Sequence, residues 1–197
     1  TQKSLRQWKR KAGNHRSFSV VSHPVTRLFR AYATHFTATG AQAYSGIRET
    51  LRDYYGINFP IADSPEFDQP SNHRLAFGAF ARFVGSNLAG QTSIRVDAAW
   101  ASQHEILRGF SQFTAPDHIL REPSLAQGLS FLAGEVGISA DNLPPESEFS
   151  NVTLDDIYDD EIEALVRSAY QRDYMVFGFA RWDDAQEFRP LASPELR

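Results

Sequence analysis

The chain has 197 residues, no cysteine and a formal net charge of −4, and 42% of its residues are hydrophobic. A chain of this length is expected to form one domain whose hydrophobic core needs no disulfide support. The lack of cysteine excludes disulfides, thiolate catalysis and cysteine-ligated zinc or iron–sulfur sites. No apolar run reaches the roughly 18 residues of a membrane span and no apolar signal segment opens the chain, so we expect a soluble, cytoplasmic protein.

The charge is segregated along the chain. Residues 1–50 carry nine Lys or Arg and one acid, whereas residues 51–197 carry eleven basic and 23 acidic residues. A nucleic-acid-coating protein usually has a basic surface over its whole domain, so we expect no nucleic-acid partner. The six histidines include no pair at metal-ligand spacing on one helix face, and we expect no metal site.

In the first half of the chain, the pattern predicts a basic helix within residues 1–16 and then a short strand, Phe18–Ser22, buried on both faces. Ser22 is a preferred N-cap residue and Pro24 is favoured at the first position of a helix. One apolar stripe follows at helical spacing: Val25, Leu28, Phe29, Tyr32 and Phe36. Further helices are predicted over Ser45–Tyr55 and from near Ser71, with a loop between them.

In the second half, apolar residues from Trp100 to Phe110 recur at near-helical spacing, and a second strand is predicted at His118–Arg121. A helix is then predicted from Pro123 to Gly137, followed by a linker over residues 141–150. The last helix is predicted to begin at Thr153, with acidic residues in its first turn. We therefore predict a helix-rich α/β domain with a small parallel sheet, of which Phe18–Ser22 and His118–Arg121 are the visible strands.

The junction between the first strand and the helix after it predicts an anion site. A helix N-terminus offers unpaired N–H groups at the positive end of a dipole. The Ser22 hydroxyl can donate there, and Arg27 and Arg30 can reach back as charge-assisted donors. The alternative is that Ser22 only caps the helix, while the two arginines are solvated or paired with acids.

The segment Ser22–Tyr32 resembles the 3′-phosphate-binding segment of sulfotransferases that use 3′-phosphoadenosine 5′-phosphosulfate, in the carbohydrate and bacterial branch. Three further segments resemble parts of that family in the same order: Asp97–Gln103, Asp117–Leu125 and Tyr158–Phe179. The resemblance covers residues 17–179 of a single domain, 1–197, with a basic segment at 1–16 and a tail at 180–197. It implies a P-loop-like sulfotransferase fold that is N-terminally incomplete, because the family's 5′-phosphosulfate loop has no counterpart in residues 1–16.

The resemblance implies 3′-phosphoadenosine 5′-phosphosulfate as cofactor, bound by Ser22, Arg27 and Arg30. It also implies an acceptor with a hydroxyl or amine, either a small molecule or a carbohydrate. The family's Arg falls on Ser22 and its Ser on Arg30, so the two residue types are exchanged at the same spacing. The family's His falls on Ala99, and we assign no catalytic base, since His35 is the only candidate and is better explained as an exposed or core-edge imidazole.

Two hypotheses follow from these motifs. The chain is part of a sulfotransferase whose phosphosulfate loop lies upstream, or it is a degenerate, non-catalytic sulfotransferase-like binding domain. An upstream Gly- and Lys-containing loop in the reading frame would favour the enzyme, and a start codon directly before Thr1 would oppose it. A weaker hypothesis is an unrelated α/β domain with an anion site. If no upstream strand is present, the sheet edge at Phe18–Ser22 needs cover from a partner chain, as in a homo-oligomer, or from the Leu5–Trp8 segment.

Overall fold

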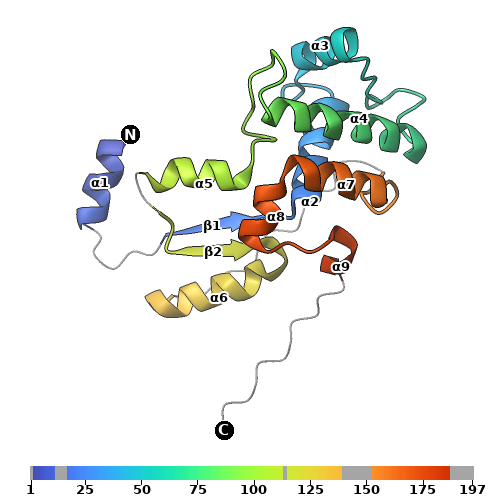
Figure 1. Cartoon of the computed structure of the whole chain (residues 1–197). Coiled ribbons are helices and arrows are strands. Elements are labelled where there is room, and N and C mark those ends of the chain that lie inside the picture. The colour runs from blue at the N-terminus through green and yellow to red at the C-terminus, as the bar shows by residue number, and fades with distance from the viewer. Residues whose placement is uncertain (1, 12–16, 113–114, 139–151, 187–197) are drawn as a thin grey trace. The chain divides into compact units, whose positions relative to one another are not determined.

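The computed structural model describes residues 2–11, 17–112, 115–138 and 152–186 (Figure 1). The chain divides into two compact units, a first unit within residues 1–22 and 101–149 and a second unit within residues 23–100 and 150–197. The expectation of a single domain stays a prediction. In the described part of the chain, no helix is both long enough and apolar enough to cross a membrane.

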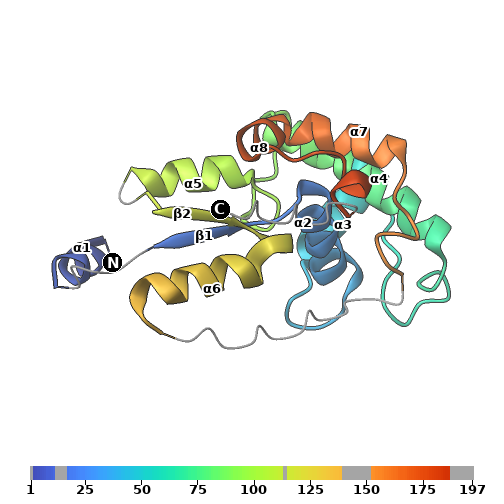
Figure 2. The ribbon, with the colours of Figure 1, turned by 90° about the horizontal axis from the view of Figure 1, so that it is seen from below.

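The first unit is built around two parallel strands. Its elements are α1 (Gln2–Lys11), β1 (Phe18–Val21), α5 (Gln103–Ser111), β2 (His118–Arg121), the 3-10 turn η2 (Glu122–Ser124) and α6 (Leu125–Val136). The strands pair in parallel, with Phe18 opposite His118. Helices α5 and α6 lie on opposite sides of the strand pair in both views (Figures 1 and 2). The predicted class, helix-rich α/β with a small parallel sheet, is therefore confirmed at this coarse level.

The burial predicted for the first strand is wrong on one face. Phe18 is 46% exposed and Val20 is 41% exposed, although parallel strands are normally covered on both faces. In the strand register these residues share a face with His118 and Leu120 of β2. Phe131 of α6 packs against His118, at 6.0 Å between ring centroids, so α6 contacts this face on its β2 side. The sequence pattern predicted an apolar strand, but it did not indicate how much of that strand the helix α6 covers.

The second unit is helical. Its elements are α2 (Pro24–Ala31), the π-helical turn η1 (Tyr32–Thr37), α3 (Ser45–Tyr55), α4 (Pro70–Leu88), α7 (Asp160–Ala169), α8 (Gln171–Phe177) and α9 (Trp182–Gln186). Helices α4 and α7 run side by side in Figures 1 and 2. The predicted helix at Ser45–Tyr55 is confirmed residue for residue, and it ends where Gly56 adopts the left-handed conformation.

Aromatic residues fill the core of the second unit. Five large aromatic side chains are fully buried: Tyr32, Phe36, Phe77, Phe80 and Trp100. The apolar stripe predicted for the helix after Pro24 is confirmed, since its members are buried or partly buried in this cluster. Trp100 was predicted at near-helical spacing with Phe110, but it precedes α5, which starts at Gln103. The Ser102 side chain accepts the Glu105 N–H at 3.3 Å and so fixes the helix start after the tryptophan.

The last long helix begins later than predicted. Asp159 is the N-cap of α7, where its carboxylate accepts the Ile162 N–H at 2.9 Å. Thr153 instead belongs to a separate turn, in which its N–H and hydroxyl both donate to the Asp156 carboxylate. Several Asp residues in a row each suit a helix start, and the chain uses the one that directly precedes the buried Ile162.

Candidate functional site

The helix at the predicted anion site is capped by His23. Its imidazole Nδ1 accepts the Val25 N–H at 3.3 Å, and its Nε2–H donates to the Ala180 carbonyl at 3.2 Å. The prediction that Ser22 caps this helix is therefore wrong. Pro24 occupies the first helical position, so the N-cap is the residue directly before it, and that residue is His23.

The backbone of Ser22 is bonded on both sides by one side chain of the first unit. The Ser22 N–H donates to Gln103 Oε1 at 2.9 Å, and Gln103 Nε2 donates to the Ser22 carbonyl at 2.8 Å. Gln103 is only 7% exposed. The backbone N–H groups of Ser22 and Val25 lie at the predicted anion site. Both donate to side chains of the protein, to Gln103 and His23 respectively.

Arg27 points into the second unit. Its guanidinium donates to the Ala98 carbonyl at 2.7 Å. Burial lowers the pKa of Arg27, while the nearby Tyr170 and Asp173 act in the opposite direction. Asp173 is fully buried, whereas Arg27 is half-buried. We therefore assign Arg27 a role in positioning α2.

Arg27 brings together three of the four sequence segments that carry the resemblance. It lies on α2, Ala98 lies in the segment 97–103, and Asp173 lies on α8. A second contact joins the last two segments, because the Tyr170 hydroxyl donates to the Trp100 carbonyl at 2.7 Å. Segments about 70 residues apart in sequence therefore meet around one guanidinium.

The other two residues considered in the sequence analysis, Arg30 and His35, lie in α2 and in the turn η1. Arg30 lies in the last turn of α2, and its side chain is partly exposed. The His35 ring stacks on Tyr44, with centroids 4.1 Å apart, and its Nδ1–H donates to the Gln42 carbonyl at 2.8 Å. The expectation that His35 is an imidazole at the edge of the core agrees with these contacts.

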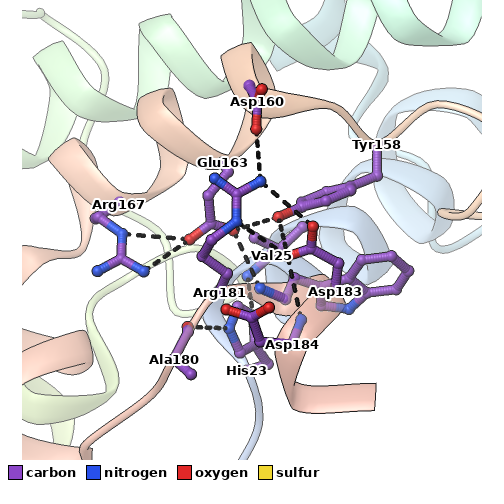
Figure 3. A network of polar contacts seen from close by, with 11 residues as sticks. His23, Val25, Tyr158, Asp160, Glu163, Arg167, Ala180, Arg181, Asp183 and Asp184 are labelled. Atoms are coloured by element: carbon purple, nitrogen blue, oxygen red, sulfur yellow. Dashed lines mark hydrogen bonds and ion pairs between the residues drawn. The ribbon is translucent and has the colours of Figure 1, made fainter. Parts of the chain in front are cut away.

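A buried carboxylate, Glu163 of α7, forms the centre of a polar network that the sequence interpretation missed (Figure 3). Glu163 is 3% exposed. It accepts hydrogen bonds from the Tyr158 hydroxyl at 3.0 Å, the Arg167 guanidinium at 3.1 Å and the Trp182 N–H at 3.3 Å. Burial, and then the bond to Glu163, raise the pKa of Tyr158, so this tyrosine stays protonated and acts as a donor at neutral pH.

His23 lies on the α2 side of the same network (Figure 3). Its ring meets Tyr174 and Phe179 edge-on, with centroids 5.4 and 5.2 Å away. Burial lowers the pKa of His23, although the bond to Ala180 and the Glu163 charge partly oppose this. The neutral ring is the form that can accept at Nδ1 and donate at Nε2 together.

The Tyr174 hydroxyl is buried and makes no hydrogen bond of ordinary geometry to any described residue. Burial, and then the Glu163 charge, raise its pKa. The network therefore offers a neutral imidazole, a buried carboxylate and two protonated phenols.

Pro24 at the first helical position was the one sequence signal that could have identified His23 as the cap.

No family model, curated protein or solved structure matches this chain. Among the described residues, no group of three or more His, Asp or Glu side chains is placed to hold a metal ion.

Proposed function

We propose that this chain is a sulfotransferase-like protein that binds 3′-phosphoadenosine 5′-phosphosulfate at helix α2 and transfers its sulfuryl group to a hydroxyl or amine acceptor. Arg30 is the cation proposed for the 3′-phosphate, and Ser22, directly before the N-cap, stays the hydroxyl donor that the sequence predicts. The cofactor would supply the sulfuryl group. The protein would hold the nucleotide and neutralise phosphate charge.

The observation that carries this proposal is the meeting of three motif-bearing segments at Arg27. Its 2.7 Å bond to Ala98 and its attraction to Asp173 tie α2 to the segment 97–103 and to α8. Chance matches to short motifs would have no reason to lie together in the fold. Their contact supports the interpretation that they form one unit, as the resemblance implies.

Arg30 has the chemistry that a phosphate needs. A guanidinium is permanently charged and presents N–H donors that match phosphate oxygens in pairs. Arg30 lies in the last turn of α2, and Arg27 and Arg30 are both partly exposed. Arg27 donates to the Ala98 carbonyl. The fit is incomplete at the start of the helix, because the His23 imidazole already accepts the Val25 N–H.

That incomplete fit favours a second candidate function, a non-catalytic domain that binds a nucleotide or another anion. The His23 cap on Val25 and the inward position of Arg27 both remove donors that an enzyme would direct at phosphate. The family's His is replaced by Ala99, and we assign no general base. Binding without transfer is the outcome that this candidate requires.

The test is ligand-dependent thermal stability. Adenosine 3′,5′-bisphosphate should raise the melting temperature of the wild type, because a ligand at a hundredfold excess over its Kd stabilises the fold by about 2.7 kcal/mol. Adenosine 5′-monophosphate, which lacks the 3′-phosphate, should give a much smaller shift. Arg30→Ala should abolish the shift, whereas the control Arg52→Ala, an exposed arginine paired with Asp53 on α3, should retain it.

No shift at millimolar bisphosphate would overturn the proposal, as would equal shifts with the monophosphate. If the bisphosphate binds, an assay for sulfuryl transfer distinguishes the two candidate functions. Release of adenosine 3′,5′-bisphosphate from the phosphosulfate in the presence of mixed sugar, phenol and amine acceptors supports the enzyme. Binding with no release supports the non-catalytic domain.

A further inference from the structure

A cavity in the second unit lies away from the residues proposed to bind nucleotide. It has a volume of about 610 Å³ and lies between the loop that follows α3 and the first half of α4. Its buried wall is apolar and includes Ile57, Phe59 and Ala76, and Leu75 lines it as an exposed side chain. Small-molecule sites in proteins typically measure roughly 300–1,000 Å³ and combine apolar walls with a few polar groups.

The charge on the cavity lining is negative. Of the residues that line the cavity, Glu66 is the one with a charged side chain, and it is exposed. A carboxylate at the edge of an apolar cavity attracts a cation and repels an anion, so the charge selects the sign of the ligand.

We propose that this cavity binds a small molecule with an apolar ring and a primary ammonium group. The ring packs against Ile57 and Ala76, and the Glu66 carboxylate supplies the opposite charge. None of these residues belongs to the proposed nucleotide site, so the failure of either proposal leaves the other standing.

The experiment uses the full chain and three probes of similar size, titrated calorimetrically at neutral pH. They are 2-phenylethylamine, the uncharged 2-phenylethanol and the anion 3-phenylpropionate. We expect the amine to bind about tenfold more tightly than the alcohol and the anion not to bind. Glu66→Gln should remove the preference for the amine, whereas Glu49→Gln, the same change at an exposed residue of α3 outside the cavity, should leave it unchanged.

Ala79→Leu tests the location, since Ala79 lines the cavity from α4 and a larger side chain fills it. Loss of binding in a folded variant supports the proposal, and unchanged binding overturns it. Equal affinity for all three probes, or none at millimolar concentration, also overturns it.

Discussion

The inward position of Arg27 can be tested by a double-mutant cycle with Asp173. The variants are Arg27→Met, Asp173→Leu and the double variant, each of which replaces a charged group by an apolar one. If the two charges stabilise each other inside the second unit, either single change leaves a charge in a poorly solvated place. The double variant removes both charges, so no charge is left without its counterpart.

The expected magnitudes follow from the contacts. Arg27→Met loses the 2.7 Å charge-assisted bond to Ala98 and the attraction to Asp173, which is 0% exposed. A bond to a charged group contributes about 1.5–3 kcal/mol, and breaking a buried pair costs about 3–5 kcal/mol. We expect a loss of about 4 kcal/mol for Arg27→Met and about 3 kcal/mol for Asp173→Leu. The double variant should lose only about 3 kcal/mol, so the coupling energy is about 4 kcal/mol.

The assay is urea unfolding followed by tryptophan fluorescence in a Trp8→Phe background. The remaining tryptophans, Trp100 and Trp182, are both buried in the second unit, so the signal reports on that unit. An unchanged m-value is needed for the comparison. Single losses below about 1 kcal/mol, or losses that add to within about 0.5 kcal/mol, would refute an interior role for Arg27 and leave it available to a ligand.

Two other predictions concern acid stability and the helix α6. The pKa of His23 lies below its ordinary value of 6.5, so the unfolded chain takes up a proton more readily, and stability should fall as the pH drops below 6.5 toward the folded-state pKa. The pKa of His73 is lowered in the same way, so His23→Asn, whose amide oxygen can still accept the Val25 N–H, should make the slope between pH 7 and 5 shallower without removing it. Identical slopes in urea unfolding would contradict this. In α6, a Cβ on Gly128 would lie 2.8 Å from Leu120, whereas one on Gly134 would meet nothing within 4 Å. Gly134→Ala should therefore stabilise the first unit by about 0.5–1 kcal/mol, and Gly128→Ala should be less stable than Gly134→Ala by about 1–2 kcal/mol, measured by far-UV circular dichroism in urea. Equal changes would contradict the close approach at Gly128.

The helices and strands were predictable because their signals are local. The helix at Ser45–Tyr55, the strand at His118–Arg121 and the helix end at Gly137 all follow from spacing and from residues with special backbone preferences. Gly137 adopts the left-handed conformation after α6, which few other residues tolerate. These features need no knowledge of distant contacts.

The parts that the sequence did not predict depend on distant contacts. The exposure of Val20 depends on where α6 packs, about 100 residues later in the chain. Gln103 bonds to Ser22 across 81 residues, and the His23 bond to Ala180 spans 157. Neither residue type signals such a partner in advance. Glu163 resembled one more acid in the first turn of a helix, whereas in the structure it is the buried acceptor for Tyr158 and Arg167.

The different positions of Arg27 and Arg30 decide which of them can report on ligand binding. They are three residues apart on α2, and the sequence alone treats them as equivalent cations. Arg27 is engaged with Ala98 and Asp173, so its removal lowers stability whether or not a nucleotide is present. Arg30 is the cation proposed for the 3′-phosphate, so Arg30→Ala should abolish the increment that the nucleotide adds. A comparison of both variants with and without adenosine 3′,5′-bisphosphate thus separates helix positioning from phosphate binding. A nucleotide-dependent increment that survives in Arg30→Ala but disappears in Arg27→Met would reverse the two assignments.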